Sequence, residues 1–122
     1  MSKIMLIEDD RTMVDLLKTL LSIEGYEVVA FHGSEELLPA IRRENPDVIL
    51  LDVNLKNLGV RWESGFELLI ALREDQDLCR IGVIISSGMN YQEESRTAGA
   101  DGFIMKPYMP DDLLNLIKTT LS

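Results

Sequence analysis

Short apolar runs alternate along the chain with segments in which apolar residues recur every three or four positions. The short runs are typical of strands buried on both faces of a parallel sheet, and the longer period is typical of amphipathic helices. The alternation therefore predicts an α/β domain built from βαβ units around a parallel sheet. The five expected strands are 3–7, 27–31, 48–52, 83–87 and 102–106.

Helical spacing is clearest between the first two expected strands. Apolar residues recur at helical intervals over 13–21, and Gly25 supplies a C-terminal stop. Segment 65–74 carries a similar apolar face, and Pro110 opens a last helix with two aspartates in its first turn. We predict helices in all three places.

Two other connecting segments have weaker helical patterns. Ser34 can cap the second helix, but Pro39 inside it lacks a backbone N–H and should kink or shorten it. Segment 90–101 has few apolar residues, so the fourth helix should be short or weakly anchored and is the expected mobile element.

The length of 122 residues predicts one domain over 1–122, with no output domain in this chain. Hydrophobic residues make up 46% and charged residues 27%, which is typical of a soluble globular protein. The apolar runs are too short to span a membrane and no signal peptide is evident, so we expect a cytoplasmic protein without membrane contact. The single cysteine, Cys79, has no disulfide partner and should be a structural or surface thiol.

The formal net charge is −9, from 21 acidic and 12 basic residues. Phosphate backbones and anionic lipids would repel such a chain. We therefore expect proteins or cations as partners and no direct contact with nucleic acid.

Polar side chains follow four of the five expected strands at the point where each strand ends. They are Glu8, Asp9, Asp10, Asp52, Ser87 and Lys106. Ligands of open parallel sheets bind outside the carboxyl ends of the strands, near the point where strand order reverses. Several carboxylates at one edge repel one another unless a cation lies among them, and Mg²⁺ prefers oxygen ligands. The pattern therefore predicts a Mg²⁺ site.

The same side chains suit phosphoryl transfer, in which catalysis is mainly positioning and neutralisation of charge. Asp52 would attack phosphorus and become an acyl phosphate. The Lys106 ammonium and the Ser87 hydroxyl could each contact a phosphoryl oxygen.

In these motifs the chain resembles the receiver domains of two-component response regulators, including chemotaxis regulators, over essentially its whole length. The family's acidic pair is matched by Glu8 and Asp9 in "LIEDD", and its phosphorylated aspartate by Asp52 in "VILLDVNL". Its hydroxyl residue followed by a small residue is matched by Ser87-Gly88, and its Lys-Pro by Lys106-Pro107 in "AGADGFIMKPY".

The resemblance implies a flavodoxin-like (βα)5 fold, doubly wound, with strand order 2-1-3-4-5. It implies that Mg²⁺ is held directly by Asp9 and Asp52, by Glu8 largely through water, and by the backbone carbonyl of Asn54. The Lys106–Pro107 peptide bond is expected to be cis, as in the family.

The resemblance also implies a signalling switch rather than an enzyme, although the domain assists its own phosphorylation and dephosphorylation. A histidine kinase or histidine phosphotransfer protein would supply the phosphoryl group. Ser87 would then move toward it and Phe103 would turn inward, which changes the face formed by the fourth helix, the fifth strand and the fifth helix. That face would bind a downstream protein target, and phosphorylation could also drive formation of a homodimer.

The chain departs from the family between Asp52 and Gly65, which are thirteen positions apart in an enlarged loop. Lys56 stands where the family has a proline. Arg61 and Trp62 in this loop could shield the acyl phosphate or contact a partner.

A second departure lies between Ser87 and Gly99, where the chain is nearly one helical turn shorter than usual. This supports an abbreviated fourth helix and puts the usual output geometry in question. Met89 lies where the family controls access of the hydrolytic water, although an apolar surface residue is an equal interpretation.

Three other polar residues have competing interpretations. Asp10 is interpreted as a helix N-cap, with a direct metal role as the alternative. Ser86 could replace Ser87 as the switch hydroxyl, and we prefer Ser87 because a glycine follows it. His32 follows the second strand and is interpreted as a surface or supporting residue, away from the acidic cluster.

Other function classes have weaker support. A pseudo-receiver would keep the fold as a protein-interaction module without phosphorylation. A haloacid-dehalogenase-like phosphatase normally has a second acid two positions after its nucleophile, where this chain has Asn54. Nucleotide-binding glycine motifs are absent from the sequence. DNA binding would require that this chain be the first part of a longer protein.

Overall fold

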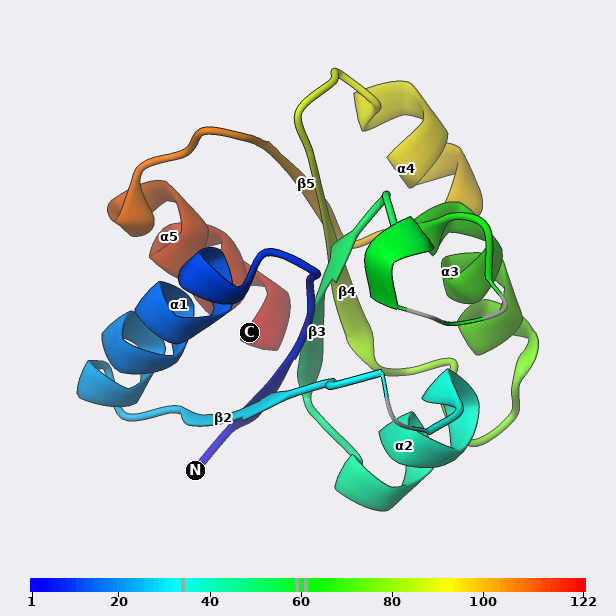
Figure 1. Cartoon of the computed structure of the whole chain (residues 1–122), viewed down its shortest axis with the longest axis horizontal. Coiled ribbons are helices and arrows are strands. Elements are labelled where there is room, and N and C mark those ends of the chain that lie inside the picture. The colour runs from blue at the N-terminus through cyan, green and yellow to red at the C-terminus, as the bar shows by residue number, and fades with distance from the viewer. Residues whose placement is uncertain (34, 59, 61) are drawn as a thin grey trace.

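One parallel sheet of five strands, in the order β2-β1-β3-β4-β5, forms the centre of the molecule (Figure 1). The computed structural model describes residues 1–33, 35–58, 60 and 62–122. The strands are β1 (Lys3–Ile7), β2 (Glu27–Ala30), β3 (Val48–Asp52), β4 (Gly82–Ser87) and β5 (Gly102–Met105). This is the predicted strand order, and strand order reverses beside β1.

Helices cover both faces of the sheet. They are α1 (Arg11–Ile23), α2 (Leu37–Glu44), α3 (Gly65–Glu74), α4 (Gln92–Ala98) and α5 (Pro110–Leu121), with a short 3-10 helix η1 (Lys56–Leu58) after β3. Helices α1 and α5 lie on one side of the sheet, and α2, α3 and α4 lie on the other (Figure 1). The fold is the predicted doubly wound, flavodoxin-like arrangement.

Two apolar clusters, one on each face of the sheet, hold these layers together. Alternate residues of β1 point into opposite clusters, so that Met5 packs with α2 and α3 residues and Leu6 packs with α1 and α5 residues. Every residue of β3 is buried. Burial on both faces explains why the sequence shows continuous apolar runs rather than alternation.

The predicted strands agree with the structure to within one residue at each end. Strands β2 and β5 end one residue earlier than predicted, and β4 begins one residue earlier. The hydrogen bonds nevertheless continue past the strand ends, because the Phe31 N–H donates to the Leu6 carbonyl and the Lys106 N–H donates to the Ser87 carbonyl. This continuation holds Lys106 at the carboxyl edge of the sheet.

The predicted ends of α1 and α3 are confirmed. Asp10 accepts a hydrogen bond from the Met13 N–H at the start of α1, and Gly25 has a φ of +92° just beyond its end. Ser64 and Glu67 form a capping box at the start of α3.

Helices α2 and α4 are both short. Pro39 is the third residue of α2, in the first turn, where an N–H has no partner within the helix, so its missing donor is tolerated. The predicted cap at Ser34 lies outside the described residues. Helix α4 has seven residues, of which only Ser95 is buried, as its apolar-poor sequence predicts.

No helix among the described residues is long and apolar enough to cross a membrane. Cys79 is exposed, so it is a surface thiol.

Candidate functional site

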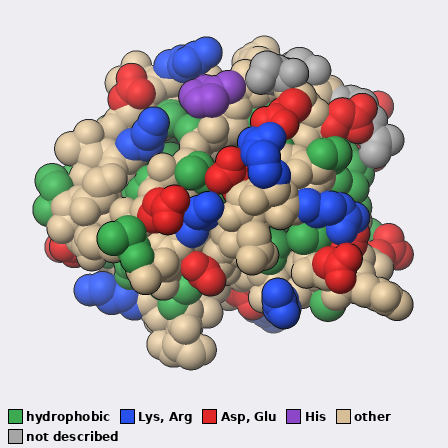
Figure 2. Space-filling model, turned by 90° about the horizontal axis from the view of Figure 1, so that it is seen from below, with side chains coloured by type: hydrophobic (Ala, Val, Ile, Leu, Met, Phe, Trp, Pro, Cys, Tyr) green, Lys and Arg blue, Asp and Glu red, His purple; other side chains and the backbone are tan. Residues whose placement is uncertain are grey.

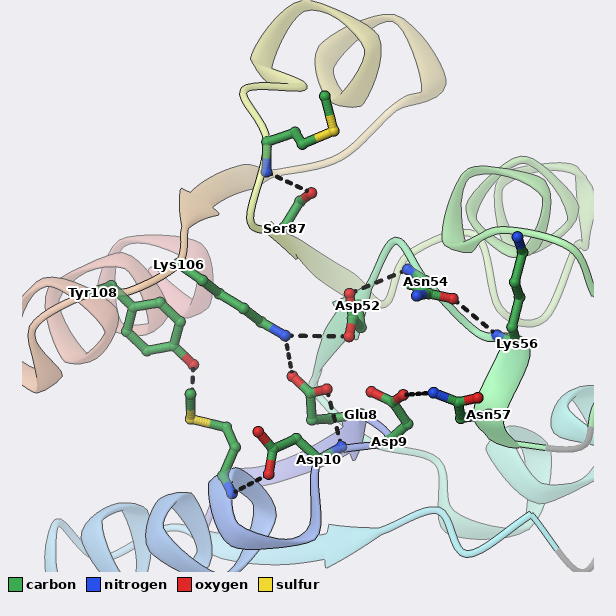
Figure 3. A network of polar contacts seen from close by, with 12 residues as sticks. Glu8, Asp9, Asp10, Asp52, Asn54, Lys56, Asn57, Ser87, Lys106 and Tyr108 are labelled. Atoms are coloured by element: carbon green, nitrogen blue, oxygen red, sulfur yellow. Dashed lines mark hydrogen bonds and ion pairs between the residues drawn. The ribbon is translucent and has the colours of Figure 1, made fainter.

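The carboxyl ends of β1, β3, β4 and β5 meet at a pocket of about 520 Å³. Ile7 of β1 is paired with Leu51 of β3, and Asp52 is paired with Ser86 of β4, so residues just after these positions reach the same edge. The pocket lining includes six predicted site residues, which are Glu8, Asp9, Asp52, Asn54, Ser87 and Lys106. Topology therefore brings together residues up to 98 positions apart in the chain (Figure 3).

Three carboxylates form a tight cluster in this pocket. One oxygen each of Glu8, Asp9 and Asp52 lies within 4.8 Å of the other two. Glu8 and Asp52 are each only 5% exposed, whereas Asp9 is half-buried. Such a set of anionic oxygens is electrostatically unfavourable without a cation.

Lys106 supplies part of the missing positive charge. Its Nζ lies 2.6 Å from Glu8 Oε1 and 3.2 Å from Asp52 Oδ2 (Figure 3). Burial lowers the pKa of Lys106, but the hydrogen bond to Glu8 and the charge of Asp52 outweigh burial, so the pKa of this ammonium is raised overall. Lys106 therefore remains charged at neutral pH.

The same surroundings also raise the pKa of Glu8, and for a carboxyl a raised pKa favours the neutral form. Burial and the neighbouring Asp52 carboxyl raise the pKa of Glu8 to about 7, against the opposing effect of Lys106. One ammonium therefore does not neutralise the cluster.

Asp9 has a partner that the sequence did not predict. The Asn57 side-chain amide, from η1, donates to Asp9 Oδ2 at 2.8 Å (Figure 3). Partial burial raises the pKa of Asp9, but the hydrogen bond from Asn57 and the interaction with the Glu8 side chain outweigh burial and lower it overall. The only signal for Asn57 in the sequence is its place in the enlarged loop after β3.

Backbone contacts fix the position of Asp52 at the end of β3. The Asn54 N–H donates to Asp52 Oδ1 at 3.1 Å. Gly65 packs so closely that a Cβ there would lie 2.5 Å from the Asp52 backbone oxygen. A side chain at position 65 would displace the end of the strand.

The enlarged loop closes at its base through backbone contacts. The Gly65 N–H donates to the Val53 carbonyl at 2.8 Å, and Asn54 and Ser64 form an antiparallel bridge. Trp62 is half-buried and packs against the apolar cluster under α2 and α3. The predicted shielding role of Trp62 stays a prediction, and Arg61 lies outside the described residues.

Ser87 presents its hydroxyl at the pocket but is engaged with its own loop. Its Oγ accepts a hydrogen bond from the Met89 N–H at 3.1 Å (Figure 3). Ser86, the alternative, is 2% exposed, and its backbone carbonyl accepts from the Val53 N–H. Met89 lines the pocket and is 63% exposed, so both of its interpretations stay open.

Two further predictions concern β5 and the residues that follow it. Phe103 is half-buried against the apolar cluster under α2 and α3, and its switch role stays a prediction. The Lys106–Pro107 bond is cis, as predicted.

The placement of His32 away from the acidic cluster was wrong. Its side chain is exposed, as predicted, but it lines a pocket of about 120 Å³ together with Glu8, Asp9 and Asn57. The reason is that β2 is directly paired with β1, so the residues after both strands share one edge of the sheet.

Residues 4–118 match the family model of the response regulator receiver domain. The chain belongs to the response regulator receiver domain family. Receiver domains are phosphoacceptor signalling switches, so the chain is a regulator domain of that class.

Solved receiver structures share the fold over almost the whole chain. The chemotaxis protein CheY4 of Vibrio cholerae is 26% identical, with a TM-score of 0.83, and the match covers 99% of each chain. A CheY-like response regulator receiver domain protein from Methanospirillum hungatei is 34% identical, with a TM-score of 0.81, covering 99% of this chain and 94% of that one.

Curated relatives include both short and long proteins. The polar-differentiation response regulator DivK of Brucella ovis is 29% identical, and the match covers 97% of this chain and 94% of DivK. A protein of Porphyridium aerugineum named "Probable transcriptional regulator ycf27" is 31% identical over 98% of this chain, which spans about half (48%) of that relative.

Proposed function

We propose that this receiver domain is a phosphoacceptor switch in which Asp52 takes a phosphoryl group from a phosphohistidine of a histidine kinase or histidine phosphotransfer protein. The observation that carries the proposal is the position of Asp52 at the end of β3, buried among two further carboxylates and in contact with the Lys106 ammonium. A purely structural aspartate would not require this costly arrangement of charge.

The donor set fits Mg²⁺. Receiver domains bind Mg²⁺ at an acidic pocket, and this pocket offers carboxylate oxygens from Glu8, Asp9 and Asp52. The Asn54 carbonyl would complete the protein ligands, with Glu8 acting largely through water. When bound, the ion neutralises charge on the phosphoryl oxygens and on the acids.

In the transfer, one Asp52 carboxylate oxygen forms a bond to phosphorus while the bond between phosphorus and the donor imidazole nitrogen breaks. The electron pair of that bond remains on the imidazole nitrogen. The contact of Lys106 Nζ with Asp52 places a positive charge beside the phosphoryl group as it arrives. Hydrolysis of the acyl phosphate later restores the carboxylate.

The switch would begin at Ser87. Its hydroxyl would exchange the contact with the Met89 N–H for a contact with a phosphoryl oxygen, and Phe103 would turn inward behind it. The face formed by α4, β5 and α5 would then bind a downstream protein or a second copy of the domain. Met105 on β5 is 48% exposed, which gives that face an apolar contact point.

The acidic surface favours protein partners over nucleic acid, because a net charge of −9 repels phosphate backbones. Any DNA binding would be a property of a longer protein that contains this domain.

Beryllofluoride, a stable mimic of the aspartyl phosphate, tests the proposal. Amide NMR spectra of the protein would be recorded with Mg²⁺ alone and with Mg²⁺ and beryllofluoride, for the wild type and for Asp52→Asn. We expect resonances of β4, α4 and β5 to shift in the wild type only. No change in the wild type would instead favour a pseudo-receiver that acts by binding alone.

A further inference from the structure

An open groove of about 650 Å³ lies between α3 and α4, on the side of the molecule away from α1 and α5 (Figure 1). Its apolar and acidic lining residues come from both helices. They are Phe66, Ile70, Ala98, Glu74, Glu93 and Glu94. None of these residues belongs to the acidic pocket at the carboxyl edge of the sheet.

The floor of the groove is apolar and uncovered. Ile70 is 47% exposed on α3, beside the half-buried ring of Phe66. Helix α4 has only seven residues and buries only Ser95, so it leaves this side of α3 open. An exposed isoleucine and an aromatic ring in one concave surface are typical of a contact site for another protein.

The rim of the groove is acidic. Glu74, Glu93 and Glu94 are exposed, and none of them forms an ion pair with any residue in the described part of the chain. Arg73 also lines the groove, but its guanidinium donates to three backbone carbonyls and pairs with Asp101 at 2.9 Å. Its charge is therefore already compensated, and the groove presents net negative charge.

We propose that this groove docks a basic amphipathic helix of another protein. Apolar side chains one turn apart on that helix would pack on Ile70 and Phe66, while lysines or arginines on its flanks would lie beside the three glutamates. A partner helix lying lengthwise in the groove between α3 and α4 would bury the exposed apolar surface and at the same time neutralise the acidic rim.

A second copy of this chain is a poorer occupant. Its net charge of −9 would add to the charge of the rim. The adjacent arginines Arg42 and Arg43 of such a copy are already in ion pairs, Arg42 with Asp75 and Arg43 with Glu35. Figure 2 shows one face of the molecule, on which basic side chains are interspersed with acidic ones and form no continuous basic surface.

An aromatic pair connects the lining of the groove to the lining of the acidic pocket. The rings of Phe66 and Tyr91 meet edge to face, with centroids 5.5 Å apart and planes at 86°. Tyr91 also lines the acidic pocket. Docking should therefore be linked to the state of Asp52, a consequence that rests on the proposed function.

A displayed library of helical peptides of about 16 residues, with a fixed apolar stripe and randomised charges beside it, tests the docking. The full chain would be the target, and enriched peptides would be compared on Ile70→Ser and Glu74→Gln. Matched controls are Leu16→Ser, which alters an equally exposed apolar residue on α1, and Glu24→Gln, which alters an exposed acid at the end of α1. Amide NMR would map the contact.

We expect enrichment of basic peptides, about tenfold weaker binding to Ile70→Ser than to the wild type, and no change with either control. Amide shifts should cluster in α3 and α4. Failure to enrich any peptide, enrichment of acidic peptides, or equal binding to Ile70→Ser would each overturn the docking proposal. Dimers that depend on Ile70, detected by sedimentation, would also overturn it in favour of a second copy.

The link to Asp52 is measured separately, as the affinity of an enriched peptide with and without beryllofluoride. A change in affinity that Tyr91→Ala removes would support the link. Equal affinities, in a protein whose spectrum does respond to beryllofluoride, would refute the link and leave both the docking site and the proposed function standing.

Discussion

Glu8 provides a test of the electrostatics of the acidic pocket. Burial and the Asp52 carboxyl raise its pKa from 4.5 to about 7, so the folded protein holds a proton there that the unfolded chain releases more readily. The resulting contribution to stability is fully present below the unfolded value and is lost as the pH rises through about 7. The metal-free protein should therefore become less stable between weakly acidic and weakly basic pH.

The size of the effect follows from the two pKa values. Between about pH 5 and about pH 8, linkage gives a loss of about 2 to 3 kcal/mol in the free energy of unfolding. Glu8→Gln keeps the shape of the side chain and removes its titration. The difference in stability between Glu8→Gln and the wild type should therefore grow by about this amount over the same range.

Urea denaturation in the presence of a chelator, at several pH values, measures this difference directly. Glu24→Gln, which changes an exposed acid, is the control and should run parallel to the wild type. Saturating Mg²⁺ should reverse the loss at high pH, because the ion binds the deprotonated carboxylates. Parallel pH profiles for the wild type and Glu8→Gln would refute the reasoning.

Three further changes have defined outcomes. Lys106→Met leaves the buried carboxylates without their cation and should lower the free energy of unfolding by about 3 kcal/mol, as measured by urea denaturation at neutral pH. A urea midpoint equal to that of the wild type would contradict this prediction. Asn57→Ala removes the hydrogen bond to Asp9 and should raise the pKa of the Asp9 carboxyl, as measured by a carbon-13 NMR titration. A titration curve identical to that of the wild type would show that the contact is not formed in solution. Gly65→Ala should lower the thermal unfolding temperature, because the added Cβ would lie 2.5 Å from a backbone oxygen of β3. Gly88→Ala is the control and should leave that temperature unchanged, because a Cβ there meets open space. Equal unfolding temperatures for the two variants would contradict the close packing at Gly65.

Much of the fold and the pocket could be predicted because their signals are local in the sequence. Strands β1 and β3 appear as unbroken apolar runs, and the polar residues that follow them must lie at one edge once the strands are parallel. The helix ends at Asp10 and Gly25 follow from single-residue capping preferences. The acidic cluster is thus a consequence of topology.

Features that depend on loop paths and side-chain packing could not be predicted in this way. Asn57 reaches Asp9 because the enlarged loop returns toward β1, and no spacing rule describes that path. His32 was placed too far from the acids because pairing of β2 with β1 was not used to position it. The groove beside Ile70 exists because α4 is short, and its lining depends on how α3 and α4 pack.

Phosphorylation of Asp52 is the central claim, and intact mass spectrometry after incubation with acetyl phosphate tests it most directly. The protein would be measured with Mg²⁺ and with a chelator, beside Asp52→Asn. We predict the mass of one added phosphoryl group on the wild type with Mg²⁺, and none with the chelator or on Asp52→Asn. An adduct on Asp52→Asn, or an unmodified wild type that also fails to accept the group from phosphohistidine donors, would contradict the account.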